Sequence, residues 1–187
     1  GRAALGGKIT NLAEDFNMSN IIAALLLPIP VLHLWLHALL PAWRRQPLSF
    51  YVFCLLLWAG AFFLVPKIEQ VSPIAFVPGA ALQNVALAVI GLGVLLMLAS
   101  LLTLGFRRFF LWGVLHPAEF PVLKPSNFIF ILLPHPAYFG YILVAVGNVL
   151  TSGKFYTIGI LALLLILLPL VIWLEEEELK SRIKNQN

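Results

Sequence analysis

Four adjacent carboxylates are the first candidates for chemistry in this sequence. Glu175–Glu178 follow directly after a long apolar run. Adjacent carboxylates repel one another, and a helix directs their side chains to different sides, so one or two could face the inside of a helix bundle and bind a cationic ligand. The alternative is a solvated helix end, balanced by Lys180, Arg182 and Lys184.

A second candidate is the segment 135–140, whose sequence HPAYFG opens another apolar run. Pro136 suits the first turn of a helix. His135 would then lie at the helix entrance, where free backbone N–H groups favour an anion. Gly140 permits close approach of another backbone or of a ligand. A capped helix with Tyr138 at the membrane interface explains the same residues without a ligand, so both interpretations stay open here.

Glycines and histidines inside apolar runs are a third group. Gly91 and Gly93 are separated by one leucine, a pattern that in membrane helices marks helix–helix contact more often than a ligand. The pair is not a dinucleotide fingerprint, because no strand precedes it and the third glycine is missing. His33 and His37 have the one-turn spacing of metal ligands, but the chain offers too few further ligands, so an interfacial or buried polar pair is favoured and no metal site is predicted.

Composition places these residues in a membrane protein. Hydrophobic residues make up 61% of the chain and charged residues 11%, against roughly 25% charged residues in soluble domains. The mean hydropathy is +0.97. A net charge of +4 spread along the chain gives no basic patch for nucleic acid, and the single cysteine, Cys54, excludes an internal disulfide framework.

The apolar runs predict an all-α, polytopic membrane helix bundle with about five transmembrane helices, since a span needs about 20 residues. The predicted spans are 20–43, 47–66, 80–106, 137–152 and 155–174. A tight turn at 151–154 would join the last two into a hairpin. Residues 125–136 are expected to be irregular or re-entrant, because of the Leu-Pro-His-Pro break.

Basic residues predict which side of the membrane each loop faces. One set of loops carries eight: Arg44, Arg45, Arg107, Arg108, Lys124, Lys180, Arg182 and Lys184. The other carries four: Arg2, Lys8, Lys67 and Lys154. The C-terminus, the loop 105–136 and the candidate site are therefore expected in the cytosol.

The chain start differs in composition from the rest. Residues 1–17 are polar and rich in small residues, and Met18 follows them. We expect part of this segment to have been added for expression, with Met18 as the natural start and a short interfacial helix as the alternative. Residues 18–187 are expected to form a single transmembrane domain.

In their order along the chain, these features resemble a family of membrane methyltransferases. The family includes phosphatidylethanolamine N-methyltransferases and isoprenylcysteine carboxyl methyltransferases, and the similarity covers roughly residues 80–180. The shared features are Gly91-Leu92-Gly93, Leu104-Gly105-Phe106, Phe120-Pro121, His135-Pro136-x-Tyr138-x-Gly140 and Glu175-Glu176. The resemblance implies S-adenosylmethionine as cofactor and a methyltransferase-like domain.

By the same resemblance, the cofactor site would consist of Gly91, Gly93, His135, Tyr138, Gly140, Glu175 and Glu176. The ammonium, sulfonium and ribose of the cofactor suit carboxylates, and its own carboxylate suits His135. Where the carboxyl methyltransferases have arginine before His-Pro, this chain has Pro134. The implied acceptor is therefore the amine of phosphatidylethanolamine or its methylated forms. Isoprenylcysteine carboxylate, a small thiol, a reductase activity that uses NADPH and a non-catalytic bundle are the alternatives.

The expected reaction is a one-step methyl transfer that needs a neutral amine. A lipid ammonium resembles lysine and must lose a proton first, so His135 and Glu176 are the predicted catalytic residues. Arg107 and Arg108 could hold the lipid phosphate. The alternative for this pair is anchoring at the cytosolic interface.

Overall fold

The computed structural model describes residues 17–120 and 128–184. Within these ranges the regular structure is helical, apart from one isolated bridge between Ile74 and Lys154. The predicted all-α class is therefore confirmed. Almost all of the polar segment 1–17 lies outside the described residues, as does Lys124.

Four helical segments are long and apolar enough to cross a bilayer. They are Met18–Ala38, made of α2 (Met18–Leu26) and α3 (Pro28–Ala38), then α5 (Pro47–Val71), α6 (Ala80–Leu104) and α11 (Phe155–Lys184). The predicted fourth span is α10 (Pro136–Ser152), whose 17 residues reach about 26 Å. This is slightly less than the roughly 30 Å of a hydrocarbon core. The predicted polytopic bundle is thus confirmed. Of the five predicted spans, α10 is the shortest.

Prolines set the breaks in the first span. Pro28 begins α3 and has no N–H to donate, so α2 and α3 form two successive pieces. The helix ends at Ala38 rather than at the predicted Trp43, and Leu40–Arg45 form the separate short helix α4. This break places the α4 arginines beside the end of the bundle instead of on a continued span.

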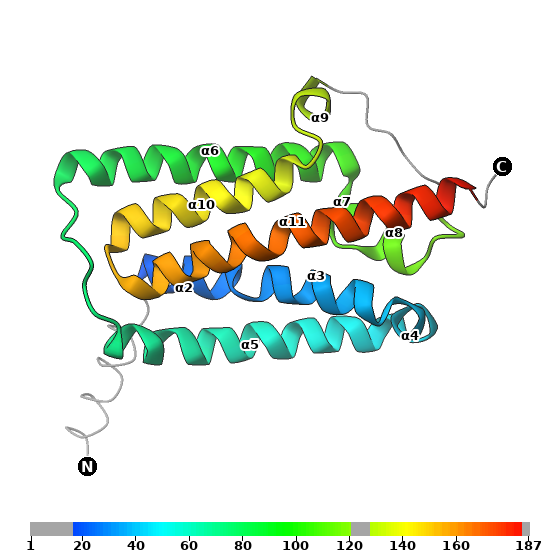
Figure 1. Cartoon of the computed structure of the whole chain (residues 1–187), viewed down its shortest axis with the longest axis horizontal. Coiled ribbons are helices and arrows are strands. Elements are labelled where there is room, and N and C mark those ends of the chain that lie inside the picture. Colours follow the sequence, from blue (N-terminus) through cyan, green and yellow to red (C-terminus); the bar gives the residue numbers. More distant parts are fainter. Residues whose placement is uncertain (1–16, 121–127, 185–187) are drawn as a thin grey trace, which may run out of the picture.

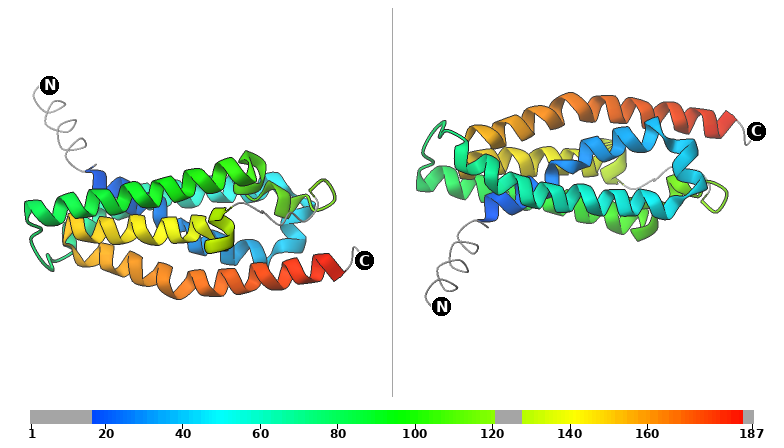
Figure 2. Two further views of the ribbon diagram at one scale, coloured as in Figure 1. Left: turned by 90° about the horizontal axis from the view of Figure 1, so that it is seen from above. Right: turned by 90° about the horizontal axis from the view of Figure 1, so that it is seen from below.

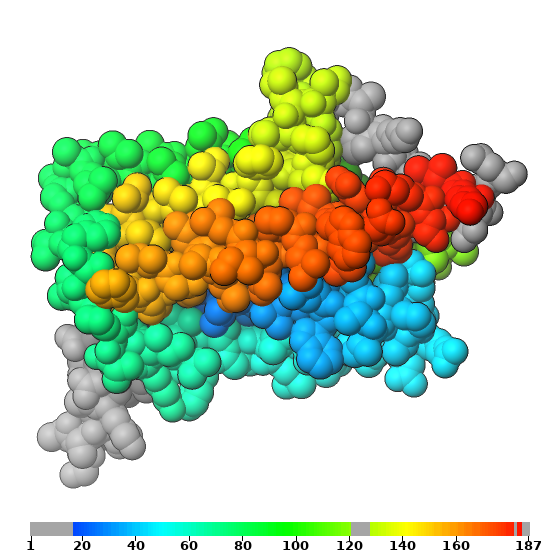
Figure 3. Space-filling model, in the orientation of Figure 1, coloured from blue at the N-terminus to red at the C-terminus, as the bar shows by residue number. Residues whose placement is uncertain are grey.

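Short helices gather at one end of the bundle (Figures 1 and 2). They are α4, α7 (Phe106–Phe109) and α8 (Trp112–Leu115), which lie near the C-terminal half of α11. We call this the carboxylate end, because it holds Glu175–Glu178. The helix α9 (Phe128–Leu132) lies within the segment predicted to be irregular and projects from the bundle (Figure 3).

Glycines bring α6 and α10 into close contact. A Cβ on Gly93 would lie 2.7 Å from the carbonyl oxygen of Gly140, and a Cβ on Gly140 would lie 2.7 Å from the carbonyl oxygen of Gly93. Gly147 repeats the pattern against Ala86. Such mutual contacts between small residues allow two membrane helices to approach closely.

The outer surface is strongly apolar. Leu102, Phe63 and Ile166 are each about 70–85% exposed, on three different long helices. By contrast, Leu164 and Leu168 of α11 are fully buried against the neighbouring helices. Apolar side chains on the outside as well as the inside are what a bilayer, rather than water, stabilises.

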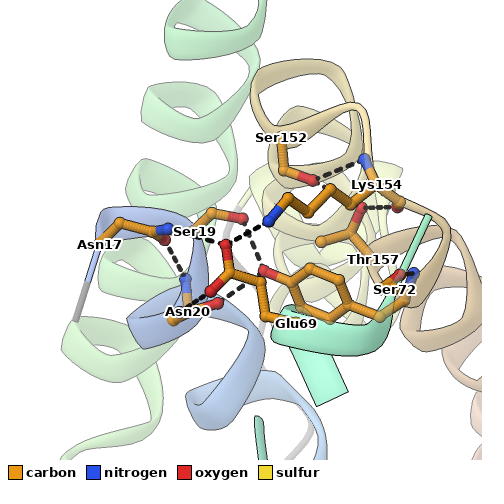
Figure 4. Close-up of polar contacts among 9 residues, drawn as sticks. Asn17, Ser19, Asn20, Glu69, Ser72, Ser152, Lys154 and Thr157 are labelled. Atoms are coloured by element: carbon orange, nitrogen blue, oxygen red, sulfur yellow. Dashed lines mark hydrogen bonds and ion pairs between the residues drawn. The ribbon is translucent and has the colours of Figure 1, made fainter. Parts of the chain in front are cut away.

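A polar cluster ties the helices together at the opposite end of the bundle, which we call the turn end (Figure 4). The carboxylate of Glu69 on α5 accepts hydrogen bonds from Lys154 Nζ at 2.6 Å and Asn20 Nδ2 at 2.8 Å. The turn between α10 and α11 lies at the same end of the bundle. It begins at Gly153, whose left-handed φ of +62° favours glycine. The predicted hairpin between these two helices is therefore present.

Candidate functional site

A cavity of about 500 Å³ opens at the carboxylate end. Its walls come from α3, α6, α7, α10 and α11, together with the segment around α8. The volume lies within the range of about 300–1,000 Å³ that is typical of small-molecule sites. Aromatic side chains and ionisable groups share the lining, so the cavity can hold a ligand with both apolar and charged parts.

Four of the residues predicted to bind the cofactor meet in this cavity. Tyr138 on α10 donates a hydrogen bond to the carboxylate of Glu175 on α11. His135 Nδ1 lies 3.8 Å from Glu175 Oε2, and His135 Nε2 lies 4.0 Å from Glu176 Oε1. The rings of His135 and Tyr138 stack with their centroids 5.6 Å apart. The histidine–proline motif and the carboxylate run are therefore brought together across the α10–α11 interface.

The carboxylate run divides into inner and outer members. The side chains of Glu175 and Glu178 are 25% and 16% exposed, whereas those of Glu176 and Glu177 are about half exposed. Glu177 accepts a hydrogen bond of 2.8 Å from Lys180 on the outer face of the helix. Three of the four carboxylates line the cavity, and Glu178 is the one that was not among the predicted site residues.

Two histidines of α3 line the cavity beside these carboxylates. His33 Nδ1 lies 2.8 Å from the carbonyl oxygen of Ile29, and the His33 ring meets the Tyr138 ring edge-on at 5.6 Å. His37 Nδ1 lies 3.4 Å from Glu178 Oε2. The predicted buried polar pair is thus also part of the cavity lining.

Arg44 fixes the position of Glu178. The Arg44 guanidinium bonds to the Glu178 carboxylate and also donates to the Val114 carbonyl at 3.1 Å. One side chain therefore connects α4, the α8 segment and α11. A charge-assisted pair of this kind is stronger than a neutral hydrogen bond and restricts the carboxylate to one orientation.

The two neighbouring arginines of α7 have different surroundings. Gly105 ends α6 with φ +75°, a conformation that suits glycine and turns the chain into α7. Arg108 lines the cavity, with its guanidinium 5.5 Å from the Phe120 ring centroid. Arg107 lies in a separate surface hollow with Trp112. Only one of the two predicted phosphate ligands is therefore part of the cavity lining.

The three glycines that were predicted to bind the cofactor are not part of the cavity lining. Among the described residues that line the cavity, none is Gly91, Gly93 or Gly140. Gly93 and Gly140 are occupied by their mutual contact, while a Cβ on Gly91 would meet no described atom within 4 Å. The contact between Gly93 and Gly140 corresponds to the helix–helix interpretation, which does not extend to Gly91 among the described residues. Their part in cofactor binding stays a prediction.

The residues of the cavity match the chemical groups of S-adenosylmethionine. Carboxylates of Glu175 and Glu176 suit an ammonium and a ribose diol, and His135 suits a carboxylate. Aromatic rings, including those of Phe109 and Phe130, offer faces for an adenine ring or a sulfonium. Donor set and volume both fit a ligand of this class.

Sequence reasoning did not place His37, Glu178 and Arg44 at the candidate site. The signal that could have found them is periodicity: His33 and His37 are one turn apart on α3, and Glu175 and Glu178 are one turn apart on α11. Two such pairs can face each other only if α3 packs on α11, which the sequence does not show.

Comparison with known proteins assigns this chain to no family. The methyltransferase resemblance therefore stays a prediction that rests on the motifs, and the cavity is the structural basis for a proposed function. No protein-family model matches the chain, and no curated protein or solved structure matches it.

Proposed function

We propose that this protein transfers a methyl group from S-adenosylmethionine to the amine of a membrane phospholipid, phosphatidylethanolamine or its methylated forms. One observation carries the proposal. The histidine–proline motif and the carboxylate run, about 40 residues apart, line one cavity at the end of an apolar helix bundle. A soluble donor and a membrane-held acceptor can both reach such a place.

The methyl donor is assigned to the α10–α11 side of the cavity. Glu175 and Glu176 bind its ammonium and ribose hydroxyls, and His135 binds its carboxylate. Bound there, the donor supplies an electrophilic methyl group on a positively charged sulfur. Tyr138 holds Glu175 in place through its hydrogen bond, so the binding carboxylate is oriented before the ligand arrives.

The lipid is assigned to the side nearer α7. Arg108 binds the phosphate, since it is the arginine of this pair that lines the cavity. The acyl chains remain against the apolar outer surface of the helices. Because the transition state disperses positive charge, alignment and exclusion of water supply most of the rate enhancement.

The carboxylate end is assigned to the cytosol. Among the described residues, Arg44, Arg45, Arg107, Arg108 and Lys180 belong to this end, whereas Lys67 and Lys154 belong to the other. Basic residues accumulate on the cytosolic side of membrane proteins. A cytosolic opening also gives the cavity access to the soluble methyl donor.

Calorimetry and a transfer assay test the proposal directly. Purified protein should bind S-adenosylhomocysteine and transfer labelled methyl groups to phosphatidylethanolamine in vesicles. The double variant Glu175→Gln, Glu176→Gln should lose binding, while Glu177→Gln, which changes an outward carboxylate of the same run, should retain it. Wild-type protein that binds no S-adenosylhomocysteine would contradict the function. Transfer to a carboxylate or thiol acceptor alone would contradict the acceptor.

A further inference from the structure

Among the residues that the structure describes, one buried side-chain nitrogen of the cavity lining makes no hydrogen bond. The His37 side chain is 5% exposed, and its Nε2 atom is buried with no hydrogen-bond partner among the described residues. A buried nitrogen without a partner is unfavourable unless a ligand replaces the hydrogen bond that water would supply. Resting on the function proposed above, we infer that His37 accepts the proton of the lipid ammonium before methyl transfer.

The surroundings of His37 select the form of the ring that can do this. Its Nδ1 atom lies 3.4 Å from Glu178 Oε2. An ionised carboxylate only accepts hydrogen bonds, so it favours the tautomer with the proton on Nδ1. The lone pair of the buried Nε2 atom is then left on the other side of the ring, and His37 is among the residues that line the cavity.

Arg44 fixes the position of the carboxylate that faces His37. Here the guanidinium of Arg44 pairs with Glu178 and offsets its charge. Glu178 is therefore a positioning residue that orients the His37 ring.

The other histidine predicted to be catalytic is less suited to accept a proton. Both nitrogens of His135 approach carboxylates, Nδ1 that of Glu175 and Nε2 that of Glu176. Carboxylates accept hydrogen bonds and do not donate them, so both nitrogens of His135 already face acceptors. We therefore assign the proton-accepting role to His37 rather than to His135.

Further ionisable groups surround His37 from several helices. His33 lies one turn earlier on α3, and Glu175 acts on it electrostatically from α11. Tyr138 and Tyr141 face the cavity from α10, and Arg108 faces it from α7. The carboxylates attract a lipid ammonium into the cavity, whereas His37 offers the lone pair that such a group can bond.

The proton and the electrons balance in two steps. The lipid ammonium gives one proton to His37 Nε2 and becomes a neutral amine. The electron pair of that amine forms the new N–C bond, while the C–S bond breaks and its electron pair remains on sulfur. The products are a methylated ammonium, a neutral thioether and an imidazolium, which returns its proton to water.

Nitrogen NMR on histidine-labelled protein tests the contact without relying on activity. The chain has four histidines, and the spectrum of His37→Asn identifies the His37 signals. In nanodiscs with S-adenosylhomocysteine bound, phosphatidylethanolamine should shift the His37 Nε2 signal. Phosphatidylcholine has no N–H on its headgroup and should leave it unchanged. Signals that respond equally to both lipids, or to neither, would overturn the inference.

Substrates that need no deprotonation test the base itself. His37→Asn and His37→Gln should reduce transfer to phosphatidylethanolamine by about 100-fold or more. Transfer to a phospholipid with an alkoxyamine headgroup, which is uncharged at neutral pH, should fall far less. The control is His116→Asn, on a histidine that stacks on Trp112 with 4.1 Å between ring centroids. Equal losses with both headgroups would overturn the base role.

The two proposals fail in different ways. If the wild-type protein binds no S-adenosylhomocysteine, the methyltransferase function is wrong. If it binds the ligand and methylates phosphatidylethanolamine, and His37→Asn does so at the wild-type rate, only the role of His37 is wrong.

Discussion

The Tyr138 hydroxyl on α10 donates a hydrogen bond to the Glu175 carboxylate on α11. This bond joins the two sequence motifs that were predicted to form one site. It also crosses the interface between two packed helices, so the shape of the cavity depends on how α10 and α11 are aligned.

Removing this hydroxyl should therefore weaken both the fold and the site. Tyr138→Phe deletes the donor to a partly buried carboxylate, and we expect a loss of about 1–3 kcal/mol in the free energy of unfolding. S-adenosylhomocysteine should bind less tightly, because Glu175 is no longer held in place. Thermal unfolding in detergent and calorimetry measure the two effects. Tyr141→Phe, one turn along the same helix, is the matched control, and equal effects of both changes would contradict the specific role of Tyr138.

The two glycines of α6, Gly91 and Gly93, should respond differently to replacement by alanine. Gly93→Ala places a methyl group 2.7 Å from the Gly140 carbonyl oxygen, and we expect a loss of about 1–3 kcal/mol from overpacking. Gly91→Ala adds a methyl group where no described atom lies within 4 Å, so the stability should be unchanged. Thermal unfolding compares the two variants. Loss of S-adenosylhomocysteine binding in Gly91→Ala, with its stability intact, would instead support the cofactor role predicted from the motif.

The polar cluster at the turn end should affect stability but not ligand binding. Glu69→Ala removes a carboxylate that accepts hydrogen bonds from Lys154 and Asn20 (Figure 4). Asn20 Nδ2 and Lys154 Nζ would lose this hydrogen-bond acceptor, which lowers the unfolding midpoint. Lys67→Met is the control, because Lys67 is exposed and lies over the Phe63 ring. A changed affinity for S-adenosylhomocysteine in folded Glu69→Ala would show that the two ends are coupled.

The sidedness of the bundle can be measured with single cysteines. In a Cys54→Ala background, cysteine at Lys180 tests the carboxylate end and cysteine at Val77, which is 84% exposed, tests the turn end. We expect a membrane-impermeant maleimide to label the first only from the cytosolic side and the second only from the opposite side. The reverse pattern would contradict the predicted orientation. Labelling of both positions from one side would contradict the span count.

Hydrophobic runs predicted most of this fold, because each span is a local property of about 20 residues. The exceptions have local causes. Pro28 divides the first span, and the chain turns away after Ala38, so that span ends five residues before Trp43. These breaks depend on packing at the carboxylate end as well as on proline.

The site was only partly predictable, because it depends on which helix faces overlap. Tyr138 and Glu175 could be paired by family resemblance. The α3 part of the lining could not, since His37 meets Glu178 only through the packing of α3 on α11. Gly93 is a residue that the sequence did single out. Its glycine motif is compatible with a ligand or with a helix contact, and only the position of the neighbouring helix α10 distinguishes these two interpretations.

The paired arginines of α7 give a comparison within a single short helix. Arg108 lines the cavity, whereas Arg107 lies in a separate hollow with Trp112. If Arg108 binds the lipid phosphate, Arg108→Gln should raise the KM for phosphatidylethanolamine about 10-fold or more, as expected for the loss of one charge-assisted contact of about 1.5–3 kcal/mol. The affinity for S-adenosylhomocysteine should be unchanged. Arg107→Gln removes the same charge from the same interface, so it separates phosphate binding from anchoring at the membrane surface. Equal increases in KM for the two variants would show that the arginines act through surface charge and not through a phosphate contact in the cavity.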